Sequence, residues 1–93
     1  MERVMNNKEM KELFKAIASL KTADESKKFF RDLCTLAELK AMSERWQVAR
    51  KIQEGVSYRK IAKKTGSSTA TITRVAHWLH HGTGGYSLIM HRP

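Results

Sequence analysis

The stretch Ser57–Arg74, "SYRKIAKKTGSSTATITR", decides the fold of this chain. Its first half sets a few apolar residues among basic ones, and its second half is rich in Thr and Ser after a single Gly. Ser57 is a favourable helix N-cap, and Gly66 can adopt the positive φ that often follows a helix. The first half therefore predicts a helix over residues 58–65 that ends at Gly66.

The second half of the stretch predicts another helix after a turn of about three residues. Ser67 or Ser68 would cap this helix, and Gly82 would end it after His81. Two short helices separated by such a turn form a helix-turn-helix, which needs a small residue in the first helix, a flexible turn and apolar contacts between the helices. The residues that meet these needs are Ala62, Gly66, Ile61, Ile72 and Val75.

Three longer amphipathic patterns precede this motif, so the fold class is all-α. The first pattern predicts a helix over residues 6–20. The capping box formed by Thr22 and Glu25 opens a second over 23–33, with Phe29, Phe30 and Leu33 expected to be buried, and Thr35 with Glu38 opens a third over 36–54. The chain is thus one domain over residues 1–93, comprising a helical dimerisation core (1–54), the helix-turn-helix (57–81) and a Gly-rich tail (82–93), expected to be an extended arm or disordered.

The positive charge of the chain is concentrated around the motif. The 93 residues carry 18 Lys and Arg against 9 Asp and Glu, a net charge of +9. Residues 1–44 hold 9 basic and 8 acidic side chains, whereas residues 45–74 hold 8 basic side chains and only Glu54. Such segregation points to an acidic partner, of which nucleic acid and anionic membranes are the first to consider.

Several other functions find little support in the sequence. Cys34 is the single cysteine, which excludes an internal disulfide, and no signal peptide or membrane span is apparent, so we expect a cytoplasmic protein without membrane contact. No nucleophile, base and orienting group form a recognisable set, and we expect no enzyme activity. His77 and His81 stand four residues apart, a spacing that can chelate a metal, but no nearby Cys or carboxylate completes a site. We therefore expect these histidines to lie at the surface or to contact phosphates, and we expect no metal site.

A helix-turn-helix would place its second helix, residues 68–81, in the major groove of double-stranded DNA. Short hydroxyl side chains can bond to bases or phosphates, and Arg74 can bind guanine with two hydrogen bonds. Basic residues of the first helix would contact the phosphates, so binding should weaken steeply with salt. The candidate DNA-binding residues are Arg59, Lys60, Lys63, Lys64, Ser67, Ser68, Thr69, Ala70, Thr71, Thr73 and Arg74.

The same residues resemble a known family. The run "TATITR", Thr69–Arg74, with the upstream "SYRKIAKKTGSS", is similar to the reading head of the bacterial Trp repressor, and the chain most resembles YerC/YecD-type relatives within that superfamily. The resemblance covers about Leu33–Leu79. It implies an intertwined homodimer in which the first three helices of both subunits form a shared core. It also implies that "HGTGGYSLIM" replaces the family's final helix.

The resemblance extends in part to the site for the corepressor, L-tryptophan. In the family two Arg side chains sandwich the indole, and Arg45 and Arg74 fall on their positions, while Thr35 falls on the Thr before the long helix. This chain departs from the family at Val75, where Gly is usual, and at Trp78, where Ser is usual. Because overfilling a packed site costs about 1–3 kcal/mol, we expect no cofactor, or another small effector in a pocket of these five residues.

The sequence therefore predicts a bacterial DNA-binding transcriptional regulator, a repressor that works without tryptophan. It would act as a homodimer on a roughly palindromic site with half-sites about 34–36 Å apart. One alternative is a nucleic-acid-binding protein without sequence preference, such as a nucleoid or RNA-binding factor. Another is an interaction protein whose charge only maintains solubility.

Overall fold

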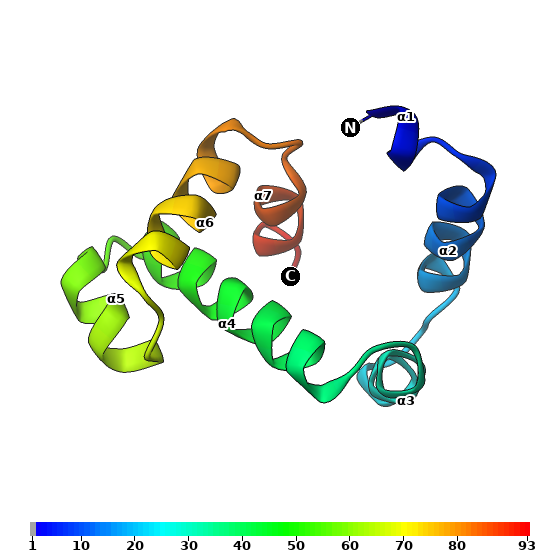
Figure 1. Cartoon of the computed structure of the whole chain (residues 1–93), viewed down its shortest axis with the longest axis horizontal. Coiled ribbons are helices and arrows are strands. Elements are labelled where there is room, and N and C mark those ends of the chain that lie inside the picture. The colour runs from blue at the N-terminus through cyan, green and yellow to red at the C-terminus, as the bar shows by residue number, and fades with distance from the viewer. Residues whose placement is uncertain (1) are drawn as a thin grey trace. The chain divides into compact units, whose positions relative to one another are not determined.

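The structure is a computed structural model that describes residues 2–93, and these residues form helices joined by short connections (Figure 1). The expected all-α class is confirmed. In the described range, none of the helices is long and apolar enough to cross a membrane. The helices are α1 (Glu2–Met5), α2 (Lys8–Ala18), α3 (Ala23–Leu33), α4 (Leu36–Gln53), α5 (Tyr58–Thr65), α6 (Thr69–His81) and α7 (Gly85–Met90).

The chain forms two compact units, one up to Leu36 and the other Ala37–Pro93. The first unit contains α1, α2 and α3. The helix expected over 6–20 is present as the shorter α2, and the unpredicted α1 precedes it. Asn7 separates the two helices, because its side chain accepts a hydrogen bond from the Met10 backbone N–H at 2.8 Å and caps α2. Asn competes well for such caps and poorly for helix interiors, which explains the break.

The helix over 23–33 begins as its capping box predicts. Thr22 Oγ1 accepts from the Glu25 N–H at 3.1 Å, and Glu25 Oε1 accepts from the Lys21 N–H at 3.0 Å. The expectation that Leu33 is buried is wrong for the single chain, because Leu33 is 50% exposed. Phe29 and Phe30 are only half-buried and meet edge to face. Although α2 and α3 are both amphipathic, neither contains a buried residue, so their apolar faces are uncovered within one chain.

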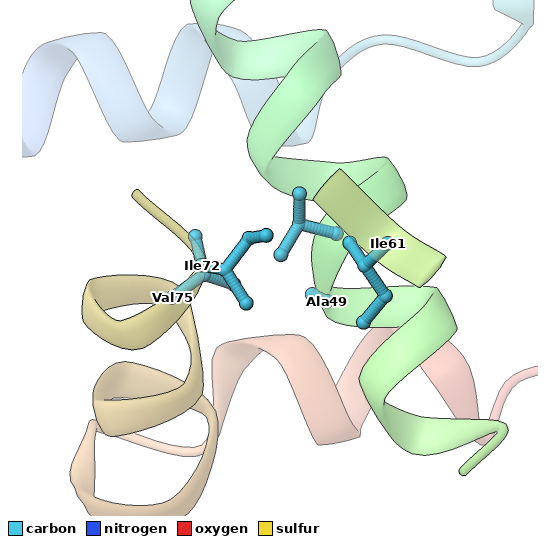
Figure 2. Close-up of a cluster of buried hydrophobic side chains, with 5 residues drawn as sticks. Ala49, Ile61, Ile72 and Val75 are labelled. Carbon is cyan, nitrogen blue, oxygen red and sulfur yellow. The ribbon is translucent and has the colours of Figure 1, made fainter. Parts of the chain in front are cut away.

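The second unit contains the hydrophobic core (Figure 2). Val48 and Ala49 from α4, Ile61 from α5, and Ile72 and Val75 from α6 form its centre, and all are nearly or fully inaccessible to solvent. Figure 2 shows Ile72 and Val75 on α6 directed toward Ile61 and Ala49. One buried cluster therefore fixes α5 and α6 against each other and against the C-terminal half of α4.

The C-terminal tail is not the extended or disordered segment that we expected. Residues Gly85–Met90 form α7, which follows Gly84 in the left-handed region at φ 88°. The Tyr86 ring stacks on the Trp46 ring of α4, with centroids 6.2 Å apart and planes 16° from parallel, and Tyr86 and Met90 pack against the core. The tail thus adds a helix that covers the core.

Candidate nucleic-acid interface

The turn between α5 and α6 is fixed by backbone geometry and by one hydroxyl group. Gly66 adopts φ 74° and ψ 5°, and its N–H donates to the Ala62 carbonyl at 2.9 Å. Thr65 Oγ1 donates to the Ile61 carbonyl at 2.7 Å and accepts from the Ser67 N–H at 3.2 Å. The predicted use of Gly66 as the turn residue is confirmed, and Thr65 ties the turn to the end of α5.

The two serines of the turn have different surroundings. Ser68 caps α6, because its Oγ accepts from the Thr71 N–H at 3.1 Å and donates to Thr71 Oγ1 at 3.1 Å. Ser67 is only 7% exposed, and its hydroxyl has no hydrogen-bond partner among the described residues. The expectation that Ser67 contacts DNA is therefore wrong for this structure, because its Oγ atom is inaccessible.

Helix α6 has one buried and one exposed face. The buried residues recur at steps of three and four, as one face of an α-helix requires, and are Ile72, Val75, Ala76 and Leu79. The residues on the opposite side are exposed, and we call them the outward face: Thr69, Ala70, Thr73, Arg74 and His77. Thr71 lies between the faces and is half-buried. The outward face carries short polar or small side chains at the N-terminal end and one Arg in the middle.

The exposed side of α5 is strongly basic. Arg59, Lys60, Lys63 and Lys64 are all exposed, while Ile61 between them is fully buried. The sequence from Gly55 to the C-terminus contains no Asp or Glu. The positive charge of α5 is therefore not offset by acidic side chains on α5, α6 or α7, and an anionic partner would meet uniformly cationic or neutral side chains.

His77 is a member of the outward face that the sequence interpretation did not assign to the interface. It follows Arg74 by three residues and Thr73 by four, so the period of the helix places it beside them. This spacing was visible in the sequence. The sequence interpretation gave His77 a surface or phosphate-contacting role but did not include it among the candidate DNA-binding residues.

The residues expected to form an effector pocket differ in burial and do not all belong to the same unit. Val75 is 2% exposed and belongs to the core cluster, so its added bulk fills the interior of the unit and does not line an open cavity. Arg45 on α4 and Arg74 on α6 are exposed, and Thr35, the residue before α4, belongs to the other unit. Trp78 is 51% exposed.

The Trp78 side chain lines a shallow cavity of about 350 Å³. The other lining residues are Gly82, Thr83, Gly85 and Tyr86. Neither of the two Arg residues that would sandwich an indole lines this cavity. The cavity is therefore formed by α6, α7 and the Gly-rich connection between them, and differs from the pocket that the sequence suggested.

Comparison with known proteins places this arrangement in a family. The family model described as Trp repressor protein matches residues 8–93. An uncharacterised protein of Bacillus subtilis (strain 168), YerC, is 43% identical over 88 residues, which are 95% of this chain and 85% of that protein. The crystal structure of a TrpR-like protein from Eubacterium eligens has a TM-score of 0.90 at 42% identity, covering 95% of this chain and 91% of the other.

A second solved structure agrees. A Trp repressor candidate from Staphylococcus aureus has a TM-score of 0.89 at 40% identity, and the match covers 95% of this chain and 88% of that one. The helix-turn-helix with its capped second helix, the family match over nearly the whole chain and the two structural matches all agree: the chain belongs to the Trp repressor family, as a YerC-type, TrpR-like member.

Proposed function

We propose that the chain is a sequence-specific DNA-binding transcriptional regulator that reads the major groove with α6. The observation that carries the proposal is that the helix-turn-helix separates its buried apolar residues from its exposed polar and basic ones. The core residues of α6 are buried, while the outward face of α6 and the basic residues of α5 are exposed. A helix with an exposed N-terminal end and small polar side chains can approach base edges closely.

The two helices would have different tasks. Arg59, Lys60, Lys63 and Lys64 on α5 would contact phosphates, which position the protein without reading sequence. On α6, the hydroxyls of Thr69 and Thr73 and the methyl group of Ala70 suit base edges, and Arg74 suits guanine O6 and N7. Ser68 and Thr71 are bonded to each other in the cap, and their role would be to hold the first turn of α6 in position.

The regulator is proposed to act as a homodimer. Val4, Met5, Phe14 and Leu33 in the first unit are between 42% and 57% exposed, and neither α2 nor α3 contains a buried residue. Burying apolar surface stabilises a complex by about 25 cal/mol per Å², so a second copy would remove this exposure. Two copies of α6 about 34–36 Å apart would read a palindromic site, and a dimer bound across a promoter would exclude other proteins and so repress transcription.

The proposed DNA binding does not depend on L-tryptophan. Where the family's corepressor site has a Gly after its second Arg, this chain has Val75 in the core, and where it has a Ser this chain has the large Trp78 side chain. Because Val75 is directed into the core, the half-exposed Trp78 side chain is the one that would take up room needed by a bound indole. Another small effector beside Arg45 and Arg74 would have to fit around the Trp78 side chain.

The decisive experiment is selection of bound duplexes from a random library with and without L-tryptophan. A palindromic consensus that appears in both selections is expected. Binding that is sensitive to salt but gives no consensus would instead favour a nucleoid or RNA-binding factor, and a consensus found only with tryptophan would refute independence from the corepressor. Absence of binding even at low salt would refute the proposed function as a whole.

A matched pair of Arg variants tests the assignment of the reading helix. Arg74→Ala should weaken binding to the consensus duplex by about 1–3 kcal/mol and relax the base preference at one position of each half-site. Arg92→Ala removes the same charge from an exposed residue beyond α7, and should leave the base preference unchanged. Equal effects of the two variants would mean that Arg74 contributes only charge.

The homodimer is tested by a charge placed on an exposed apolar face. Phe14→Glu should shift the sedimentation coefficient from that of a dimer to that of a monomer at the same protein concentration, because the carboxylate would have to be buried unpaired. Glu12→Gln on the same helix is an exposed control that keeps the apolar face intact. A wild-type protein that sediments as a monomer at micromolar concentration would contradict the dimer.

A further inference from the structure

The C-terminal half of α6 carries two histidines, His77 and His81, and the proposed DNA contacts give them no joint role. His77 and His81 are four residues apart and both are exposed, so they lie on the same side of the helix in successive turns. Their ring centroids are 5.3 Å apart, and the ring planes are inclined by 42°. No hydrogen bond holds either ring among the described interactions, whereas His91 Nδ1 is 2.6 Å from the Ser87 carbonyl oxygen.

The separation of the two rings is the one that a shared metal ion requires. A Zn–N bond of about 2.0–2.1 Å puts the metal about 3.2 Å from the centre of each ligand ring. At a tetrahedral angle between the two bonds, the ring centres are then roughly 5.2 Å apart. The observed 5.3 Å is close to this value, so the two rings are near enough to share one ion once their nitrogens are turned toward it.

We propose that His77 and His81 together chelate a late first-row divalent transition-metal ion. Imidazole nitrogen suits Zn²⁺, Ni²⁺ and Cu²⁺, whereas Mg²⁺ and Ca²⁺ prefer oxygen ligands, and no Asp or Glu follows Glu54 in the sequence. Within the part of the chain that the structure describes, no group of three or more His, Cys, Asp or Glu side chains could hold a metal. The site therefore has two protein ligands, and water completes the coordination.

Two ligands make an open and exchangeable site. A structural zinc site uses four protein ligands and is closed to solvent, whereas this pair lies on an exposed helix face that the core does not need. His80 is not part of the site: its ring centroid is 6.5 Å from that of His81, the ring planes are inclined by 69°, and adjacent residues on a helix point in different directions.

Calorimetric titration of the full-length, untagged chain with NiCl2 and with ZnCl2 tests the site without DNA, so its outcome is independent of the proposed function. One ion per chain should bind. The single variants His77→Gln and His81→Gln should each lower the affinity about ten-fold or more, because either change destroys the chelate. The matched controls His80→Gln and His91→Gln should bind as wild type does.

Titration with paramagnetic Ni²⁺ followed by NMR identifies the rings directly. The imidazole signals of His77 and His81 should broaden first and together, and circular dichroism should show the same helix content in all variants, since none of the four histidines is buried. The proposal is overturned if wild type shows no saturable binding, if His80→Gln lowers the affinity as much as His77→Gln, or if the signals of His91 broaden first.

Discussion

Ser67 and Ser68 are adjacent and chemically identical, yet their replacement by Ala should change the stability of the protein in different ways. Ser68 Oγ accepts a hydrogen bond from the Thr71 N–H and donates one to Thr71 Oγ1, both at 3.1 Å. Loss of a Ser N-cap typically costs about 0.5–2 kcal/mol. For a domain of this size, each 1 kcal/mol corresponds to about 4–8 °C in Tm, so Ser68→Ala should lower the Tm by several degrees.

Ser67→Ala should have the opposite effect or none. The Ser67 hydroxyl is buried without a partner among the described residues, and an unsatisfied buried polar group typically costs about 1–3 kcal/mol. Its removal should therefore leave the free energy of unfolding unchanged or increase it by up to about 2 kcal/mol. The hydrogen bond from the Ser67 N–H to Thr65 Oγ1 uses only the backbone and survives the substitution.

The assay is thermal unfolding of both variants at one protein concentration, since the stability of a dimer depends on concentration. Binding to a consensus duplex is measured on the same samples. Ser67→Ala should bind as wild type does, because its Oγ is inaccessible. The reasoning is refuted if Ser67→Ala lowers the Tm as much as Ser68→Ala, or if it weakens DNA binding while the fold is intact.

Other substitutions test the turn, the core, the charge and the metal pair. Gly66→Ala should lower the free energy of unfolding in urea by about 1–2 kcal/mol. The cost comes from the backbone, since φ is 74°, and not from a clash, since nothing lies within 4 Å of the added Cβ. Gly66→Asn should cost less, because Asn tolerates this backbone region. Ile72→Ala should cost about 2–5 kcal/mol, as Ile72 is fully buried. Lys63→Ala should reduce the slope of log affinity for DNA against log salt by about 1 and leave the consensus unchanged. Lowering the pH should weaken Ni²⁺ binding at His77 and His81, because protons compete for imidazole nitrogen; an affinity unchanged between acidic and neutral titrations would argue against imidazole ligands.

The sequence predicted those elements whose signals are local. The capping box at Thr22 and the positions of Gly66 and Gly82 correctly bounded α3, α5 and α6, because caps and turns depend on a few neighbouring residues. The core contacts of Ile61 and Ile72 followed from helical spacing combined with the demands of the motif. The all-α class needed only the period of the apolar residues.

The remaining features depend on contacts that spacing does not reveal. The six residues of α7 are too few for a period, and the helix is supported by the stacking of Tyr86 on Trp46, which is 40 positions earlier in the sequence. The difference between Ser67 and Ser68 is a difference in burial between neighbours, for which the sequence "SS" contains no signal. The burial of Leu33 was predicted wrongly because an amphipathic pattern indicates an apolar face but does not indicate what covers that face.

The two-faced construction of α6 has a consequence for how proteins of this fold can diverge. Stability depends on Ile72, Val75, Ala76 and Leu79, whereas Ala70 and Arg74 make no contribution to the buried cluster. Mutations on the exposed side can therefore accumulate without first being compensated by changes in packing. With the proposed function, a duplicated gene encoding this chain would be free to acquire a new DNA target site in a few steps, because the residues that stabilise the fold are not the ones proposed to contact bases.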